Sequence, residues 1–427
     1  MVCNPIIKPI KADLQEIVVS PSQSIQEAIN NANAGDMIFV QSGTYSENVI
    51  LNKSISLIGE NPSTTLIDGG GHGNVLTITS SNVWVKNFTI QNGGFTEQDK
   101  GSSLQIGTPT GESVNVSICY NVIKLSYHGI RLLDTNNSKI RYNSIMNNSA
   151  FGIYFSGSSG NSIVGNTIVN HITGVSIATE TSIFNSFYHN NFVNNTYVQM
   201  FAPTHWDDGY PSGGNYWSDY DGVDKKSGLN QDELGSDGIG DTPYPDIYLK
   251  WDKYPLIGPI AIFTAGTWDE VSYNVDVVSN STISDFYFNS KSAFIRFNVT
   301  GESGTVGFCR VVIPQKLLWV EDGWTIYVEG LSVNYTIIPN ENYTYLYFIY
   351  NHTTKTVLIQ GTHAITEFLS IRFLLLFITI TLFVVILMRK FVRKLSRTLR
   401  INESFIREAS SHVSLQSYHL KDRKRGK

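Results

Sequence analysis

The sequence predicts an all-β protein: a parallel β-helix with a short N-terminal capping helix, then a β-sandwich, then one transmembrane helix. Three observations support this prediction. A motif of about two dozen residues repeats between residues 113 and 201, alternating apolar strands follow residue 261, and a nearly uncharged apolar run ends at Met388.

Asparagine marks each repeat of the first region. Asn121, Asn143, Asn166 and Asn191 recur at spacings of 22, 23 and 25 residues, and a β-branched residue follows each by two positions. Alternating apolar residues form short strands with one buried face, and Asn and Gly supply the corners because they tolerate left-handed backbone conformations. Since each turn buries its apolar row only against its neighbours, the pattern indicates a parallel β-helix with the four asparagines stacked as a ladder.

The start of the chain reads as a cap and a first set of turns. Residues 1–20 lack the apolar core of a secretory signal. Ser24 to Glu27 has the pattern of a capping box and opens a short amphipathic helix, which we expect to cover the end of the β-helix. The run of residues 93–112 interrupts the repeat and is either a binding lip or a tolerated surface loop.

At this point a family resemblance is visible. The stretches SIQEAINNANAGDMIFVQSGTYSENVILNKSISLIGE and GNVLTI, followed by NVWVKNFTIQN and the Asn–Ile coils, resemble NosD-like, or CASH-domain, members of the pectate-lyase-like right-handed β-helices. The resemblance covers about residues 18–258. It implies a right-handed β-helix and a carbohydrate-binding, sugar-hydrolysing or copper-related accessory role, but this fold hosts several activities.

Residues 201–258 depart from the coil pattern and are dense in aromatic residues and Asp. They resemble the segment that closes the β-helix in archaeal NosD-like proteins. The aromatic side chains of this segment either stack on sugar rings or plug the C-terminal end of the β-helix, and the sequence favours the plug. If they bind sugar, the carbohydrate-binding candidates are Trp206, Tyr210, Tyr216, Trp217 and Trp251.

The same segment contains a possible calcium loop. Asp232, Asp237 and Asp241 supply hard oxygens on a glycine-relieved turn, which Ca²⁺ requires. The spacing of an EF-hand and its bidentate Glu are absent. A structural calcium site and a solvated acidic loop both remain open.

Evidence for catalysis is weak. Hydrolysis by general acid–base chemistry needs two carboxylates facing one site, and the coils between 113 and 201 offer only Asp134 and Glu180. The remaining catalytic candidates are His72, in a Gly-His-Gly turn, and the pair Asp207 and Asp208.

Metal and nucleic acid partners are also poorly supported. Copper is disfavoured because the nine His and five Met are scattered, although His128 and His171 can approach each other across neighbouring turns. Three cysteines, Cys3, Cys119 and Cys309, cannot build a disulfide framework. The body up to Met388 carries a net charge of −14, which argues against nucleic acid binding.

The sequence after Pro259 predicts a spacer domain followed by a membrane anchor. Alternating strands after Pro259 indicate an Ig-like β-sandwich that acts as a spacer. Phe368 to Met388 is long enough to cross a hydrocarbon core of ~30 Å, and the tail after it carries a net charge of +9. The positive-inside rule therefore places this tail in the cytoplasm and the body outside the cell.

These observations give one domain order and a ranked set of functions. We expect a membrane-anchored cell-surface protein that binds a polysaccharide or glycan; the alternatives are a polysaccharide hydrolase or lyase, a structural or adhesive envelope protein and, last, a copper accessory protein. The expected segments are an N-terminal segment 1–20, a β-helix 21–200, a closing segment 201–258, a β-sandwich 261–366, a transmembrane helix 368–388 and a basic tail 389–427.

Overall fold

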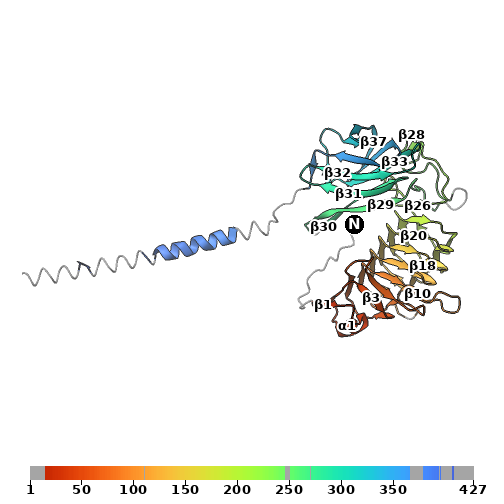
Figure 1. The fold of residues 1–427 in the computed structure, drawn as a ribbon, viewed down its shortest axis with the longest axis horizontal. Helices are drawn as coiled ribbons and strands as arrows, with labels where there is room; N and C mark the ends of the chain where they lie inside the picture. The colour runs from red at the N-terminus through yellow and green to blue at the C-terminus, as the bar shows by residue number, and fades with distance from the viewer. Residues whose placement is uncertain are drawn as a thin grey trace, which may run out of the picture. The chain divides into compact units, whose positions relative to one another are not determined.

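The computed structural model describes residues 15–109, 111–245, 251–269, 271–365, 378–393, 395 and 406–407. The chain forms two compact units, one of residues 1–365 and one of residues 366–427. In the first unit, short parallel strands stack turn upon turn, and longer antiparallel strands follow them in the sequence (Figure 1).

Three parallel sheets form the walls of the β-helix, and consecutive strands along each sheet come from consecutive turns. The first sheet contains β1 (Glu16–Val19), β2 (Met37–Val40), β5 (Ser56–Gly59), β8 (Trp84–Lys86), β12 (Ser117–Cys119), β16 (Lys139–Arg141), β19 (Ser162–Val164), β22 (Asn185–Tyr188) and β25 (Thr204–His205). The second contains β4 (Val49–Leu51), β7 (Leu76–Ile78), β10 (Ser102–Ile106), β14 (His128–Leu133), β18 (Phe151–Ser156), β21 (Thr173–Ile177) and β24 (Tyr197–Met200). The third contains β3 (Gly43–Ser46), β6 (Thr65–Asp68), β9 (Thr89–Gln91), β13 (Val122–Lys124), β17 (Ser144–Met146), β20 (Thr167–Val169), β23 (Asn191–Val193) and β26 (Tyr216–Trp217).

The stack extends past both predicted ends of the β-helix. β1 lies inside the predicted N-terminal segment 1–20, yet it pairs in parallel with β2. β25 and β26 lie in the predicted closing segment, and they continue the first and third sheets. Two further sheets have only two strands each. One pairs β11 (Ser113–Val114) with β15 (Thr135–Asn136), and the other pairs β27 (Lys226–Ser227) with β28 (Glu233–Leu234).

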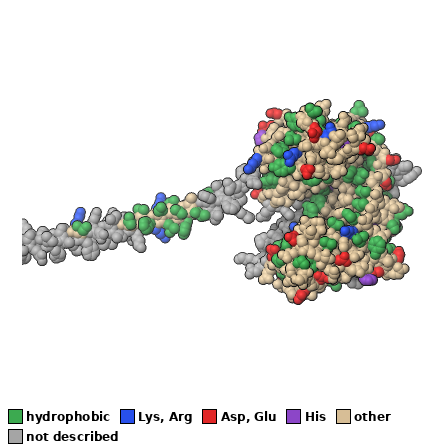
Figure 2. All heavy atoms as spheres, viewed as in Figure 1, with side chains coloured by type: hydrophobic (Ala, Val, Ile, Leu, Met, Phe, Trp, Pro, Cys, Tyr) green, Lys and Arg blue, Asp and Glu red, His purple; other side chains and the backbone are tan. Residues whose placement is uncertain are grey.

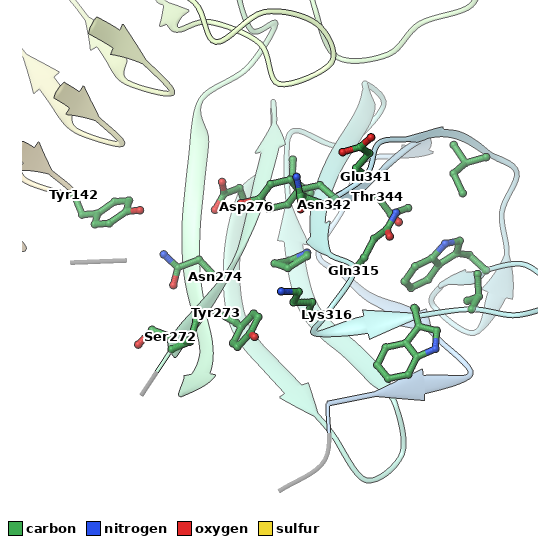
Figure 3. Close-up of a pocket in the computed structure, with 18 residues that line it drawn as sticks. Tyr142, Ser272, Tyr273, Asn274, Asp276, Gln315, Lys316, Glu341, Asn342 and Thr344 are labelled. Carbon is green, nitrogen blue, oxygen red and sulfur yellow. The ribbon is translucent and has the colours of Figure 1, made fainter. Parts of the chain in front are cut away.

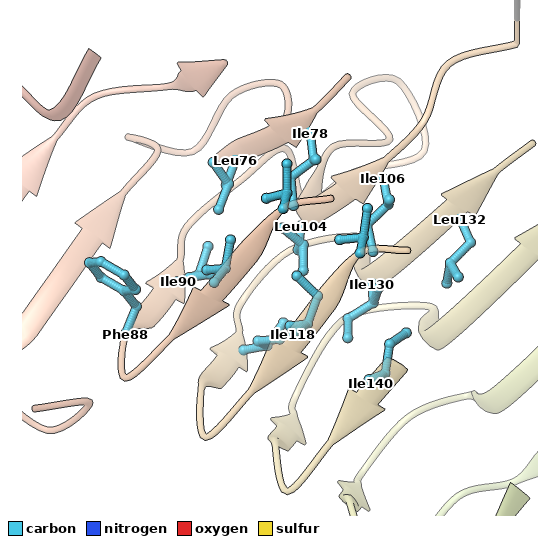
Figure 4. Packing of buried hydrophobic residues seen from close by; sticks show 14 of the residues in the cluster. Leu76, Ile78, Phe88, Ile90, Leu104, Ile106, Ile118, Ile130, Leu132 and Ile140 are labelled. Carbon is cyan, nitrogen blue, oxygen red and sulfur yellow. The ribbon is translucent and has the colours of Figure 1, made fainter. Parts of the chain in front are cut away.

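Equivalent apolar residues of successive turns stack on one another inside the three sheets. Leu76, Leu104 and Ile130 are register partners along the second sheet, and all three are fully buried. Figure 4 shows these side chains, with Ile118 and Ile140 of the first sheet, directed into the same interior. Burying each such side chain stabilises the fold by about 1.5–3 kcal/mol, so a regular repeat is itself the source of the core.

A ladder of asparagine side chains runs along one corner of the β-helix. The backbone N–H of Asn121 donates to Oδ1 of Asn143 at 3.0 Å, and Asn143 donates in the same way to Asn166 at 3.0 Å. Each side-chain Nδ2 donates to that same oxygen of the next rung, at 3.1 and 3.0 Å. The predicted stacking of these three residues is therefore present, and all three are buried.

The fourth rung is Asn190, and the prediction of Asn191 is wrong by one residue. Asn166 N–H donates to Oδ1 of Asn190 at 2.9 Å, and Asn190 N–H donates to Oδ1 of Asn215 at 3.1 Å. Asn191 instead bonds through both side-chain atoms to the backbone of Ile260, at 2.8 and 2.9 Å. We define the ladder as Asn121, Asn143, Asn166, Asn190 and Asn215.

Asn and Gly supply left-handed corners as expected, for example at Asn147 with φ of 54° and Gly165 with φ of 70°, but the rungs of the ladder are not among these residues. The residue immediately before a rung is left-handed instead, as at Gly165 and at Tyr142 with φ of 58°. Gly129 and Gly152 lie inside strands β14 and β18 instead. A Cβ on Gly129 would lie 2.6 Å from the carbonyl oxygen of Gly152, so glycine is required there by close approach of the next turn.

The predicted helix near the N-terminus is α1 (Ile25–Asn31), which begins after Ser24 and buries Ile25, Ala28 and Ile29. Ser24 Oγ accepts from the N–H of Glu27, as expected for an N-cap. Glu47 from the following turn, rather than Glu27, contributes the carboxylate: it accepts from the N–H of Ile25 at 2.7 Å and of Gln26 at 3.1 Å.

Two antiparallel five-stranded sheets follow and share one hydrophobic core, which makes a β-sandwich. The first sheet contains β29 (Ile260–Trp268), β30 (Val271–Ser279), β33 (Val306–Pro314), β38 (Tyr343–Asn351) and β37 (Tyr335–Pro339). The second contains β31 (Thr282–Asn289), β32 (Phe294–Thr300), β39 (Lys355–Gln360), β35 (Thr325–Val328) and β36 (Leu331–Ser332), and a separate pair joins β34 (Leu318–Trp319) to β40 (His363–Ala364).

Residues 378–393 form a helix, and the apolar side chains of this helix are exposed (Figure 2). Among the described residues, no helix is both long enough and apolar enough to cross a membrane. Residues 368–377 of the predicted transmembrane helix lie outside the described part of the chain, as does most of the predicted tail 389–427.

We expect replacement of a middle rung to destabilise the β-helix strongly. Asn166→Ala leaves the N–H and Nδ2 of Asn143 without their acceptor and the carbonyl of Ile140 without its donor. Because each unsatisfied buried group costs roughly 1–3 kcal/mol, the free energy of unfolding should fall by about 3 kcal/mol or more in a urea titration. Asn52→Ala, at an exposed position of the same domain, is the matched control; equal stability of the two variants would contradict the ladder's role.

Candidate functional site

Two of the predicted sugar-binding aromatics are core residues. Trp206 and Trp217 are only 1% and 2% exposed. Trp206 stacks on Phe187 with ring centroids 4.6 Å apart, and Trp217 stacks on Phe192 at 4.3 Å. Since Phe187 and Phe192 belong to the last coil, these indoles close the end of the β-helix core and have no free ring face for a sugar.

The other three predicted aromatics also serve packing. Trp251 packs against the β-helix core, with its ring centroid 6.1 Å from that of Trp206. Tyr210 and Tyr216 pack against a smaller apolar cluster, in which Ile239 and Leu256 of the closing segment meet Ile260, Val278 and Phe308 of the β-sandwich. The closing segment is thus a plug on one side and a joint to the sandwich on the other.

The ladder ends on a buried carboxylate that sequence reasoning missed. Oδ2 of Asp252 accepts from the backbone N–H of Asn215 at 2.7 Å, from its Nδ2 at 3.3 Å and from Nε1 of Trp217 at 2.9 Å. Oδ1 accepts from the N–H of Tyr254 at 3.1 Å. Asp252 is fully buried, and burial raises the pKa of its carboxyl to about 7, against the lowering effect of these donors.

The proposed calcium residues are not gathered around one point. Oδ1 of Asp237 accepts from the N–H of Ile239, and Oδ1 of Asp241 accepts from the N–H of Lys225 and of Lys226, all at 3.0 Å. Within the described ranges, no group of three or more His, Cys, Asp or Glu side chains lies close enough together to hold a metal ion. The structure therefore does not bring Asp232, Asp237 and Asp241 together as the calcium loop that the sequence suggested.

A different aspartate shares the surroundings of Asp237. The carboxylate of Asp224 accepts from the N–H of Asp237 at 3.1 Å and of Gly238 at 2.8 Å. Burial raises the pKa of Asp224 to about 7 and also raises the pKa of Asp237, which the nearby guanidinium of Arg310 counteracts. These carboxylates hold the closing segment's own turns together.

The three weak catalytic candidates lie in two separate places. The side chain of His72 is 89% exposed, and its Nδ1 lies 3.5 Å from Oδ2 of Asp99 in the loop that interrupts the repeat. Asp207 accepts from the N–H of Gly209 and of Lys253, and Asp208 accepts from Oγ of Ser212 at 2.8 Å. Since both oxygens of Asp207 are bonded to backbone, the pair is part of the fold of the closing segment.

His171 occupies a rung-like position of another corner. Its Nδ1 lies 3.0 Å from Oδ1 of Asn195, and its Nε2 lies 3.2 Å from Nδ2 of Asn148, so both ring nitrogens have partners. Burial lowers the pKa of His171 and of His128 to about 4, which keeps both rings neutral. A copper ion would need several such nitrogens free and clustered. His171 has neither nitrogen free, and in the described part of the chain no group of three or more His, Cys, Asp or Glu side chains lies close enough together to hold a metal ion.

The outward face of the second sheet carries a group of aromatic and charged side chains. Arg131 of β14 and Tyr154 of β18 are register partners, and the guanidinium carbon lies 5.9 Å from the tyrosine ring centroid. Ile130 and Leu132 point into the core, so Arg131 points outward. His128 stacks on Phe151 beside them, with ring centroids 5.3 Å apart.

The loop that interrupts the repeat borders this face. Glu97 and Lys100 form an ion pair at 2.8 Å, and the hydroxyl of Tyr127 donates to Glu97 at 2.7 Å. We define the β14–β18 face as Glu97, Lys100, Tyr127, Arg131, Phe151 and Tyr154. Among the described residues, no carboxylate forms an ion pair with Arg131. The sequence signal for this contact was the spacing of 23 residues between Arg131 and Tyr154, which matches one turn of the repeat.

We expect Asp252 to make stability depend on pH. Its pKa is raised from an ordinary value near 3.8 to about 7. The folded state therefore binds more protons than the unfolded state between these values, and the free energy of unfolding falls as pH rises from about 4 to about 7. Asp252→Asn keeps an acceptor for Asn215 and cannot ionise, so its decline in urea titrations from pH 4.5 to 8 should be shallower than that of the wild type.

The control for that measurement is Asp221→Asn, which removes an exposed carboxyl from the same segment. We expect it to keep the wild-type slope. If the free energy of unfolding of Asp252→Asn falls with pH as steeply as that of the wild type, then ionisation of Asp252 does not destabilise the fold and the prediction is wrong.

Part of the β-helix matches known proteins in sequence. Residues 29–222 match the family model described as "Periplasmic copper-binding protein (NosD)". A cell surface glycoprotein of Methanothermus fervidus is 31% identical over 153 residues, which is 30% of this chain and 26% of that protein. The chain thus spans about a quarter of the length of this curated relative.

Among solved structures, the pectate lyase Pel9A matches at 10% identity and a TM-score of 0.35 over 53% of this chain and 74% of that one. A pectin methylesterase from carrot has 13% identity and a TM-score of 0.28 over 47% of this chain and 70% of its own. Together with the parallel sheets and the side-chain ladder, the family match leads to one conclusion: residues 29–222 form a NosD-like parallel β-helix.

Proposed function

We propose that this chain is a cell-surface protein that binds glycan through the β14–β18 face. The observation that supports this most directly is the guanidinium of Arg131 on the ring of Tyr154, without a carboxylate partner among the described residues. A surface location is supported by the relative from Methanothermus fervidus, which is itself named a cell surface glycoprotein.

The chemistry of the face suits a sugar chain. Aromatic rings bind the apolar faces of sugars and leave their polar edges wet, and Tyr127, Phe151 and Tyr154 lie within ring contact of His128 or each other. A guanidinium recognises a carboxylate through two parallel hydrogen bonds. The face therefore favours a glycan that carries carboxylates, with Arg131 as its partner.

The closing segment offers fewer groups to a glycan. Its five aromatic candidates pack against apolar clusters, and the carboxylates of Asp207 and Asp252 accept bonds from the chain itself. Binding on the β14–β18 face needs no rearrangement of the core, because Arg131 and Tyr154 project from strands that stacking holds in register.

We expect Arg131→Ala and Tyr154→Ala to weaken retention of the chain on immobilised polygalacturonate at least tenfold. Arg296→Ala is a matched control, because Arg296 lies over the ring of Tyr287 at 5.5 Å in the β-sandwich. Retention should be measured by affinity electrophoresis, with circular dichroism confirming that each variant is folded. The proposal fails if Arg131→Ala and Arg296→Ala bind equally well.

The same incubation separates binding from catalysis. New reducing or unsaturated chain ends, absent from a sample without protein, would mean that the chain is a hydrolase or lyase. We expect no such ends, since the candidate acids Asp207 and Asp208 are bonded within the closing segment.

We further propose that residues 368–388 anchor the chain in a membrane. The run carries a single charge, Arg372, and basic residues follow from Arg389 onward. A segment of this length and composition crosses a bilayer. After carbonate extraction at pH 11, the full chain should stay in the membrane pellet, and a chain ending at Ile365 should be released. Release of the full chain would contradict anchoring.

A further inference from the structure

The β-sandwich contains a cavity of about 1300 Å³ that no part of the proposed function uses (Figure 3). It is lined by β30, by the residues after β33 and by β37 and β38, with Tyr142 of the β-helix at its border. Small-molecule sites usually occupy about 300–1,000 Å³. The cavity is therefore large enough for an oligosaccharide rather than a single small metabolite.

Aromatic side chains form part of the lining. Trp319 is 38% exposed, and its indole stacks on His363 with centroids 5.5 Å apart and planes 11° apart. That stacking fixes the orientation of the ring. Tyr273, Trp324 and Tyr343 line the same cavity, so more than one flat apolar surface is available to a ligand.

Amide and carboxyl groups complete the lining. Figure 3 shows Asn274 and Asp276 on the side of β30 turned toward Tyr142. Oδ1 of Asn274 is buried and, among the described residues, has no hydrogen-bond partner. Such an acceptor is costly to leave unsatisfied, and a hydroxyl donor from a ligand in the cavity satisfies it.

The charges of the lining offer little to an anion. Asp276 and Glu341 carry carboxyl groups, and Lys316 is the one cation among the lining residues. Burial raises the pKa of Asp276 to about 7, so near neutral pH its carboxyl is partly protonated and the charges of Glu341 and Lys316 nearly balance. A polyanion therefore finds no excess of positive charge here. Hydroxyl groups, by contrast, both donate to the carboxyl and amide oxygens and accept from Asn342, Gln315 and Lys316.

We propose that this cavity binds a neutral oligosaccharide, with Trp319 as a stacking platform and Asn274 and Asn342 as hydroxyl partners. The sandwich is then a second sugar-binding domain, in addition to being a spacer. This inference extends the proposed function, but it uses other residues and a ligand of another charge, so the two can fail separately.

The test is isothermal titration calorimetry, in which the affinity of the full chain in detergent is measured for mannohexaose and for cellohexaose. We expect at least one of these neutral hexasaccharides to bind, and Trp319→Ala to weaken that binding at least tenfold. Tyr287→Ala removes an aromatic ring of the same domain that is 46% exposed and outside the cavity, so it should bind as the wild type does. Tyr154→Ala, on the β-helix face, should also leave this affinity unchanged.

Asn342→Ala covers the case in which Trp319→Ala fails to fold. The side chain of Asn342 is exposed and its truncation leaves the backbone bond to Gln315 in place, and we expect a loss of at least threefold. The inference is overturned if neither hexasaccharide binds, or if binding survives both cavity variants. Loss of neutral binding in Tyr154→Ala alone would assign it to the β-helix face and overturn the cavity while keeping the proposed function.

Discussion

The ladder from Asn121 to Asp252 is the constraint on which the second half of the β-helix depends. Each rung donates its backbone N–H and its side-chain amide to one oxygen of the next, so each turn from Asn121 onward is held at a fixed height relative to its neighbour. That fixed height brings identical apolar residues into register and builds the core. A chain of such bonds needs a last acceptor, and the buried carboxylate of Asp252 supplies it. The closing segment is therefore joined to the coils by the same interaction that joins the coils to one another.

The last coil also explains how the β-helix continues into the sandwich. Asn190 and Asn191 are adjacent, and they point to different partners: Asn190 completes the ladder, and Asn191 bonds to both backbone groups of Ile260. Because the polar groups at this end are used in bonds of this kind, the closing segment has few left for a ligand. Side chains available for recognition lie elsewhere, on the outward face of β14 and β18 and around the cavity of the sandwich.

Much of the fold could be predicted from the sequence, because a regular repeat fixes both the burial and the register of its strands. The spacing of Asn121, Asn143 and Asn166 indicated three true rungs. It failed at Asn191, where two asparagines in succession fit the period equally well and only the contact with Ile260 separates them. Asn215 and Asp252 could not be found in this way, since the closing segment has no repeat.

The candidate site was harder to predict than the fold. The sequence favoured a plug formed by Trp206 and Trp217, and both are buried, but the rings on which they stack depend on where Phe187 and Phe192 end the core. Three aspartates near glycines resemble a calcium loop, yet the oxygens of Asp237 and Asp241 accept from backbone N–H groups. Arg131 and Tyr154 were overlooked because each is an ordinary residue alone, and they form a face only when the 23-residue register places one over the other.

The central claim is that sugar is recognised outside the closing segment. Hydrogen exchange of the full chain, followed by mass spectrometry with and without polygalacturonate, measures this without any substitution. We predict slower exchange in the loop of residues 93–101, whose amides lie beside the β14–β18 face. Slower exchange confined to residues 201–258, or no change in any segment, would contradict it.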